Sequence, residues 1–194
     1  MLQETASDAE QGGIDFVAFA EDCRVEGKVD LGETRLADLL NRQETITVRD
    51  CVVTSTEDGH ARSFEELEIG RDELDIVVVS GPRGDPSRRL ATRPAGVAMQ
   101  LGPYSAAGFM HGPPSANPVR GFHNRPIMVA LTDAILEYQF CSEPVEERFG
   151  TVLVNRHLAE SLHLLEGSLA EEIAKGSEAE KTAASDPEAA PTAS

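Results

Sequence analysis

Two stretches of the sequence, residues 24–74 and 105–158, repeat the same kinds of residue in the same order. The matched triplets are Val25, Gly27, Val29 with Ala106, Gly108, Met110; Ile46, Val48, Asp50 with Val129, Leu131, Asp133; and Leu67, Ile69, Arg71 with Val152, Val154, Arg156. The offset grows from 81 to 83 to 85, as two small loop insertions in the second stretch would produce. The pattern predicts two tandem copies of one small module.

The residues between these landmarks are typical of strands. Val25 to Leu31 alternates apolar and polar residues, and Ile76 to Val79 is a continuous β-branched run, which favours a buried strand. Further strands are expected at 45–56, 61–69, 96–101, 104–111, 126–140 and 146–154, with a short helix at 35–41. The leucines of 157–165 suit a helix, but the repeat favours a short turn followed by a strand. The predicted fold is mainly β, with two tandem barrel-like modules, short helices and disordered ends.

Composition divides the chain into five segments. Residues 1–20 are predicted to be a disordered acidic N-terminus, 21–80 the first β module, 81–94 a connector rich in Arg, Pro and Gly, and 95–165 the second β module. Residues 166–194 are predicted to form a short helix, capped by Ser168 and Glu171, and then a disordered acidic tail.

The formal net charge is −17, which disfavours binding to nucleic acid. Six carboxylates and no basic residue lie in 1–22, a composition unlike that of a signal peptide, and no apolar run is long enough to span a membrane. We therefore expect a cytoplasmic protein. The three cysteines and five histidines lack the spacing of a disulfide framework or a metal site, so no metal or cofactor is expected.

Asp50 and Asp133 are unusual because each falls in phase with the apolar residues of its predicted strand. A regular strand would point both carboxylates into the core, where an unpaired charge is unfavourable. Either a β-bulge turns each side chain outward, or backbone amides and the repeated arginines satisfy it. Our hypothesis is that Asp50 pairs with Arg71 and Asp133 with Arg156.

The first copy also resembles the Sm-like, SH3-like small β-barrel. The resemblance rests on the glycine-bearing strand, on Asp38 and Asn41, which match an Asp and Asn pair that the family carries in a loop, on the strand that ends at Asp50, and on the Gly70, Arg71 pair. It implies a bent five-stranded barrel in which Asp38, Asn41 and Arg71 contact a uracil base. The Gly and Arg are in reversed order, and in the second copy only Asn124 and Arg156 match. The chain as a whole looks like an actinobacterial protein of unknown function.

Two further groups of residues are candidates for binding or chemistry. Arg83, Arg88, Arg89 and Arg93 form one locally basic stretch, which could grip phosphate or could be a solvated connector. His111 and His123 flank a proline-rich loop where a pocket is conceivable, although motifs for nucleophilic or metal catalysis are absent from the sequence.

These observations favour a non-catalytic scaffold or adaptor that binds a macromolecular partner or assembles with itself. The first alternative is a nucleic-acid binder that uses Asp38, Asn41, Arg71 and the basic stretch. The second alternative is an enzyme with a pocket near His111 and His123.

Overall fold

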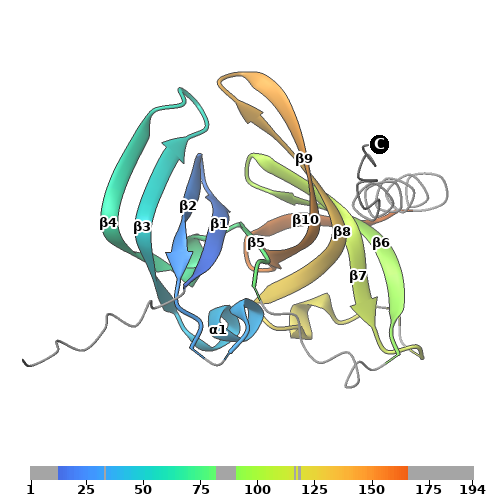
Figure 1. Cartoon of the computed structure of the whole chain (residues 1–194). Coiled ribbons are helices and arrows are strands. Elements are labelled where there is room, and N and C mark those ends of the chain that lie inside the picture. The colour runs from blue at the N-terminus through green and yellow to red at the C-terminus, as the bar shows by residue number, and fades with distance from the viewer. Residues whose placement is uncertain (1–12, 33, 82–90, 116, 118, 166–194) are drawn as a thin grey trace, which may run out of the picture.

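The described part of the chain forms one open antiparallel sheet of ten strands (Figure 1). The computed structural model describes residues 13–32, 34–81, 91–115, 117 and 119–165. The strands are β1 (Ile14–Ala20), β2 (Cys23–Val29), β3 (Thr45–Ser55), β4 (Ala61–Gly70), β5 (Ile76–Val78), β6 (Arg93–Leu101), β7 (Tyr104–Gly112), β8 (Met128–Phe140), β9 (Glu143–Asn155) and β10 (Ala159–Leu164). The helix α1 (Leu36–Arg42) and the 3-10 turns η1 (Arg71–Glu73) and η3 (Phe122–Asn124) complete the described elements.

The order of strands across the sheet is β10-β6-β7-β8-β9-β5-β1-β2-β3-β4. In the first half of the chain (13–81) the order is β5-β1-β2-β3-β4, and in the second half (91–165) it is β10-β6-β7-β8-β9. Each half therefore places its fifth strand beside its first. Figure 1 shows the two halves side by side, with α1 below them. The halves join where β9 pairs with β5, so that among the described strands β4 and β10 are the two edges of the sheet.

A β-bulge in the first half turns Asp50 out of the core. The register between β2 and β3 passes from Glu26 opposite Val52 to Lys28 opposite Arg49, so that Gly27 faces two residues of β3. Asp50 has φ of 48° and is exposed to solvent. The bulge was one of the two expected ways to avoid a buried and unpaired carboxylate, and it is the one that the chain adopts at Asp50.

The second half contains the same bulge. Between β7 and β8 the register passes from Ala107 opposite Ile135 to Phe109 opposite Thr132, and Asp133 again has φ of 48°. The glycine is required here because the backbones approach closely. A Cβ on Gly27 would lie 2.7 Å from the Arg49 carbonyl oxygen, and a Cβ on Gly108 would lie 3.0 Å from that of Thr132.

Apolar side chains gather into two clusters, one for each half of the chain. The first includes Phe16, Leu36, Leu40 and Val48, and the second includes Met99, Met110, Leu131 and Leu136, all of them almost fully buried. Neither cluster belongs purely to one half, because Leu153 of β9 joins the first and Phe19 of β1 joins the second. The side chains therefore interlock where the halves join.

Most of the expected elements are present, and the ambiguous segment 157–165 forms a strand, β10, as the repeat indicated. The predicted disorder of the N-terminus was wrong for residues 14–20: they form β1, and Phe16, Ala18 and Phe19 in it are buried. The connector is also shorter than predicted, because Arg93 and Pro94 already belong to β6. Residues 1–12 and the predicted helix and tail at 166–194 lie outside the described residues.

Among the described residues, no helix has the length and apolar character needed to cross a membrane.

Candidate functional site

The joint between the halves, which we define as β5 (Ile76–Val78) paired with Val152–Val154 of β9, is the structural feature on which a functional argument rests. Val77 lies opposite Leu153. Two backbone hydrogen bonds flank this pair: the Val79 N–H donates to the Thr151 carbonyl at 3.0 Å, and the Asn155 N–H donates to the Asp75 carbonyl at 2.9 Å. Leu153 is 1% exposed. The joint thus combines a backbone ladder with buried apolar contact.

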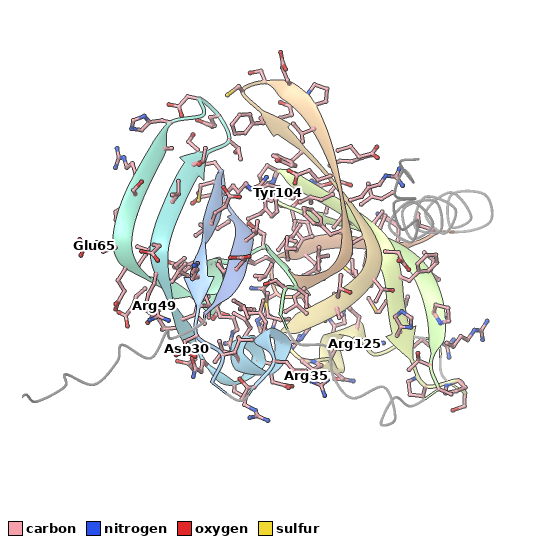
Figure 2. The ribbon with its side chains drawn as sticks, in the orientation of Figure 1. Asp30, Arg35, Arg49, Glu65, Tyr104 and Arg125 are labelled. Atoms are coloured by element: carbon pink, nitrogen blue, oxygen red, sulfur yellow. The ribbon has the colours of Figure 1, made fainter. Side chains whose placement is uncertain are left out.

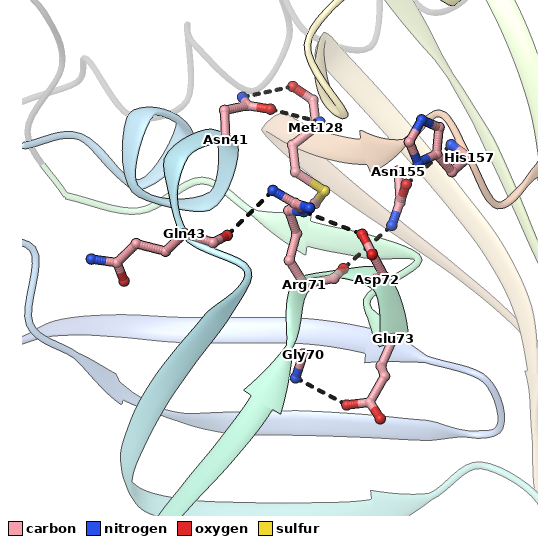
Figure 3. A network of polar contacts seen from close by, with 9 residues as sticks. All are labelled: Asn41, Gln43, Gly70, Arg71, Asp72, Glu73, Met128, Asn155 and His157. Carbon is pink, nitrogen blue, oxygen red and sulfur yellow. Dashed lines mark hydrogen bonds and ion pairs between the residues drawn. The ribbon is translucent and has the colours of Figure 1, made fainter.

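Asn41, at the end of α1, anchors the helix to the second half (Figure 3). Its side-chain amide donates to the Met128 carbonyl at 3.1 Å, and its side-chain oxygen accepts from the Met128 N–H at 2.9 Å. The amide also donates to the Ala37 carbonyl within the helix. One side chain therefore satisfies both backbone groups of a residue that begins β8.

Arg71 follows β4 and is 7% exposed. Its Nε lies 3.2 Å from a carboxylate oxygen of Asp72, and Nη1 donates to the Gln43 carbonyl at 3.4 Å (Figure 3). Its backbone N–H donates to the Glu44 carbonyl, as the Arg156 N–H does to the Ile127 carbonyl in the second half. The guanidinium of Arg71 therefore braces the end of β4 against the residues that follow α1.

Asn155 is fully buried and connects three segments at the joint. Its side-chain amide donates to the Arg71 carbonyl at 3.3 Å, and its side-chain oxygen accepts from the His157 N–H at 3.1 Å. Sequence reasoning did not identify Asn155. The available signal was a carboxamide directly after the apolar run 152–154, a position where a buried polar group needs partners.

Aromatic side chains close the other side of the joint. Phe19 of β1 meets Tyr104 and Tyr138 of the second half edge to face, with centroids 5.4 Å apart in both cases. Figure 2 shows Tyr104 between the two halves, where its hydroxyl donates to the Cys23 carbonyl at 3.2 Å. Burial raises the pKa of Tyr104.

Tyr138 belongs to a charged cluster at the same place. Its hydroxyl donates to Glu147 at 2.5 Å, and Arg24 of β2 reaches the same carboxylate at 2.9 Å. Burial, reinforced by the hydrogen bond and charge of Glu147, raises the pKa of Tyr138 to about 12. The Arg24 guanidinium also lies 5.6 Å from the centre of the Phe19 ring, so this cluster bridges β2, β8 and β9.

The register does not bring Asp50 to Arg71. Asp50 lies opposite Glu65, five residues before Gly70 on β4, which corresponds to about 16 Å along a strand. Asp133 lies opposite Gly150, six residues before Arg156. The two arginines sit at the ends of their strands, where Arg71 has the partners described above.

Of the three residues that the Sm-like resemblance assigns to base contact, two have their polar atoms engaged within the protein. Asn41 holds Met128, and Arg71 holds Asp72 and Gln43. Asp38 lies on α1 and is exposed. In the second half Asn124 ends η3 and is exposed. Arg93 is an exposed residue of β6, while Arg83, Arg88 and Arg89 lie outside the described residues.

His111 and His123 occupy different surroundings. The two ring nitrogens of His111 lie 3.1 Å from the Thr92 hydroxyl and 2.8 Å from the Thr132 hydroxyl. His123 is exposed and its ring meets that of Phe122 edge-on. The hydrogen bonds of His111 tie β7 to β8 and to the residue before β6.

A pocket of about 340 Å³ lies beside the joint and is strongly acidic. It is lined by Glu21, Asp72, Glu73, Asp75 and Glu160, together with Gly102, Pro103 and Leu158. Burial raises the pKa of Asp75; the hydrogen bond from the Glu21 N–H opposes this, and the charges of Glu21 and Glu160 add to it. Within the described ranges no group of three or more His, Cys, Asp or Glu side chains is arranged to hold a metal ion.

Comparison with known proteins adds no relative: no family model, no curated protein and no solved structure matches the chain.

Proposed function

We propose that this protein is a non-catalytic scaffold built from two copies of a five-stranded barrel-like unit, and that it works by associating through the edges of its sheet. The observation that carries the proposal is the joint itself. The chain already uses the edge of one half, β5, to bind the edge of the other, β9. The strands in the corresponding positions, β10 and β4, are the two ends of the ten-stranded sheet.

Several features support a common origin for the two units. The strands follow the same order in both halves. A glycine opposes a two-residue bulge in each, at Gly27 and Gly108, and an aspartate of identical φ occupies the bulge. Because bulges and positive φ values are demanding positions for the backbone, their recurrence at matched places favours duplication over chance.

Unpaired strand edges favour a binding role because each presents a row of backbone donors and acceptors to a further strand. The partner would be a second copy of the chain or another protein that offers an extended segment. Nucleic acid remains the alternative partner. The net charge of −17 and the internal use of Asn41 and Arg71 both count against it.

Sedimentation velocity over a range of protein concentrations tests the proposal, in parallel with a titration of single-stranded RNA at low salt. We expect the weight-average mass to rise with protein concentration and the RNA to remain unbound. A chain that stays monomeric and binds RNA with an affinity that falls steeply with salt would replace the scaffold by the nucleic-acid binder.

A further inference from the structure

We propose that β10 of one chain pairs with β4 of a second copy, antiparallel and with Leu162 opposite Glu68, so that the internal joint is repeated between molecules. This inference rests on the self-association proposed above and specifies its surface and register.

The internal joint shows which backbone groups would be used. The bonds from Val79 to Thr151 and from Asn155 to Asp75 show that alternate residues of β5 and β9 point their N–H and C=O groups at one another. Val77 and Leu153 lie between these bonds and face each other directly. An equivalent outer joint, between two molecules, therefore requires that the residues corresponding to Val77 and Leu153 direct their backbone N–H and C=O groups out of the sheet.

The matching residues follow from the hairpins. Val77 lies opposite Ala18 on β1, and Leu162 lies opposite Met99, the counterpart of Ala18, on β6. On the other side Gly70 lies opposite Thr45 at the start of β3, as Asn155 lies opposite Met128 at the start of β8. Gly70 therefore corresponds to Asn155. Glu68, two residues before Gly70, corresponds to Leu153, two residues before Asn155.

The backbone groups of these residues face away from the sheet. On β10 the N–H of Leu165 donates inward to the Gly96 carbonyl, so by strand alternation the N–H groups of Leu162 and Leu164 point outward. On β4 the Gly70 N–H donates to the Glu73 carboxylate at 3.0 Å. In the second half the corresponding N–H, that of Asn155, is the one that donates across the joint.

The contact between Asn41 and Met128 also has corresponding residues, Asn124 and Thr45, that are exposed on the surface. Asn124 is the counterpart of Asn41, and Thr45 is the counterpart of Met128. Placing β10 against β4 in the stated register brings Asn124 toward Thr45 of the next chain. Two separate contacts of the joint therefore predict the same arrangement.

The outer joint is more polar than the inner one. Glu68 stands where Leu153 is buried, and Ser161 stands in the place of Ile76. The Glu73 carboxylate accepts a hydrogen bond from the Gly70 N–H, a donor that the pairing strand would need. Glu65 and Glu66 add charge to β4, and Figure 2 shows Glu65 at the outer side of that strand. The association is therefore reversible and is strengthened by salt, which screens the like charges.

Because the two edges differ, the contact is head to tail and generates rings or filaments instead of closed two-fold dimers.

Point variants examine the edges in sedimentation velocity at low and high salt. Leu164→Pro removes an outward N–H, whereas Leu164→Ala keeps it, and Leu164 is 49% exposed, so neither change disturbs the core. We expect the proline variant to lose association and the alanine variant to keep it. Glu68→Leu, which restores the residue of the inner joint, is expected to tighten association at least tenfold. Glu137→Leu, an equal change on the exposed surface of β8, is expected to have no such effect.

Cross-linking fixes the register. In a Cys141→Ser background, a chain carrying Glu68→Cys is mixed with one carrying Leu162→Cys and treated with a mild oxidant that takes up the two electrons and two protons of the thiols. A disulfide between the two chains is expected, since directly paired strand residues lie about 5.5 Å apart at Cα. Glu68→Cys mixed with Leu164→Cys, which is shifted by two residues in the regular part of β10, is expected to cross-link much less.

The outcomes separate the two proposals. Association that persists in Leu164→Pro, or cross-linking that ignores the register, overturns the β10–β4 contact and leaves the scaffold standing. Absence of association in the wild type and in Glu68→Leu at every salt concentration overturns self-association altogether.

Discussion

Gly27 and Asp50 act together as one device at the scale of single residues. The bulge at Asp50 bends β3, and the bend brings the Arg49 carbonyl so close to Gly27 that no side chain fits there. The bulge also turns the carboxylate outward, which removes the cost of burying an unpaired charge. The same pair of residue types, Gly108 and Asp133, appears at the matching place in the second half.

Gly27→Ala is expected to lower the free energy of unfolding by about 2 kcal/mol, because the new Cβ would lie 2.6 Å from Val48 Cγ1 and 2.7 Å from the Arg49 carbonyl oxygen. Gly150→Ala is the matched control, since a Cβ there meets nothing within 4 Å. Urea unfolding followed by circular dichroism compares the two variants. Equal stability of both would show that the close approach at Gly27 relaxes without cost.

Asp75 is expected to make stability depend on pH. Because its pKa is raised by burial above the unfolded value, the folded chain binds the proton more tightly, so protonation stabilises the fold. This contribution is present below the ordinary aspartate pKa of about 4 and is lost as the pH rises through the higher folded pKa. Asp75→Asn keeps an acceptor for the Glu21 N–H and is expected to be less sensitive to pH in that window, measured by urea unfolding at a series of pH values.

Asp58 supplies a control of opposite sign. Hydrogen bonds from the His60 N–H and the Ser55 hydroxyl lower its pKa, so its contribution to stability is present above the ordinary value and is lost as the pH falls through the folded pKa. Asp75→Asn is expected to reduce the gain in stability that the protein shows on acidification. Asp58→Asn is expected to leave that gain intact. Identical pH profiles for wild type and Asp75→Asn would contradict the role given to Asp75.

At the scale of elements, α1 is held by its apolar face and by the side chain of Asn41. The helix has seven residues, too few to be stable alone, and its apolar face, with Leu36 and Leu40, packs into the first cluster. Asn41 then fixes the end of the helix to the first residue of β8.

Asn41→Leu is expected to destabilise the protein by about 2 kcal/mol, because it leaves the backbone N–H and C=O of the buried Met128 without their partners. Gln43→Leu is the control: the side chain of Gln43 is exposed, and its contact with Arg71 uses only the backbone carbonyl, which the substitution retains. Hydrogen exchange at Met128 provides a direct measurement, with faster exchange expected in Asn41→Leu alone.

At the scale of the whole molecule, the two halves are expected to unfold together. Leu153→Ala removes a fully buried side chain from the cluster of the opposite half and is expected to cost about 3 kcal/mol. Near-ultraviolet signals from Tyr104 and Tyr138 report on the contact between the halves, where both rings pack against Phe19, and far-ultraviolet circular dichroism reports on the strands of both halves. The two transitions should coincide and shift together in the variant, while Phe64→Ala, at a residue 39% exposed, should shift them little. Separate transitions would mean that each half is stable without the other.

The sequence pattern predicted most strands and the helix because these elements depend on residues that are neighbours in the chain. The strand patterns of 45–56 and 61–69 predicted β3 and β4, and the apolar run from Ile76 predicted β5. The strand β1 was missed because its apolar residues lie beside an acidic segment without alternation, and a strand buried on both faces has no period to detect.

The candidate site was harder to predict than the fold. The pairing of Asp50 with Arg71 was inferred because both residues recur in the second half. Recurrence indicates that a residue is needed by the fold, but it does not indicate which residue it contacts. The bulge moves Asp50 outward, and the register places it far along the strand from Arg71.

The sequence by itself determined the mainly β fold and the places where the backbone must bend, because hydrophobic period, turn residues and glycine act over a few neighbouring positions. Only the tertiary structure decided that β5 meets β9, that Asn41 binds Met128, and that β4 and β10 remain as edges. These contacts join residues about 75 to 87 positions apart, and their register depends on how two complete halves fit together, which no local pattern encodes.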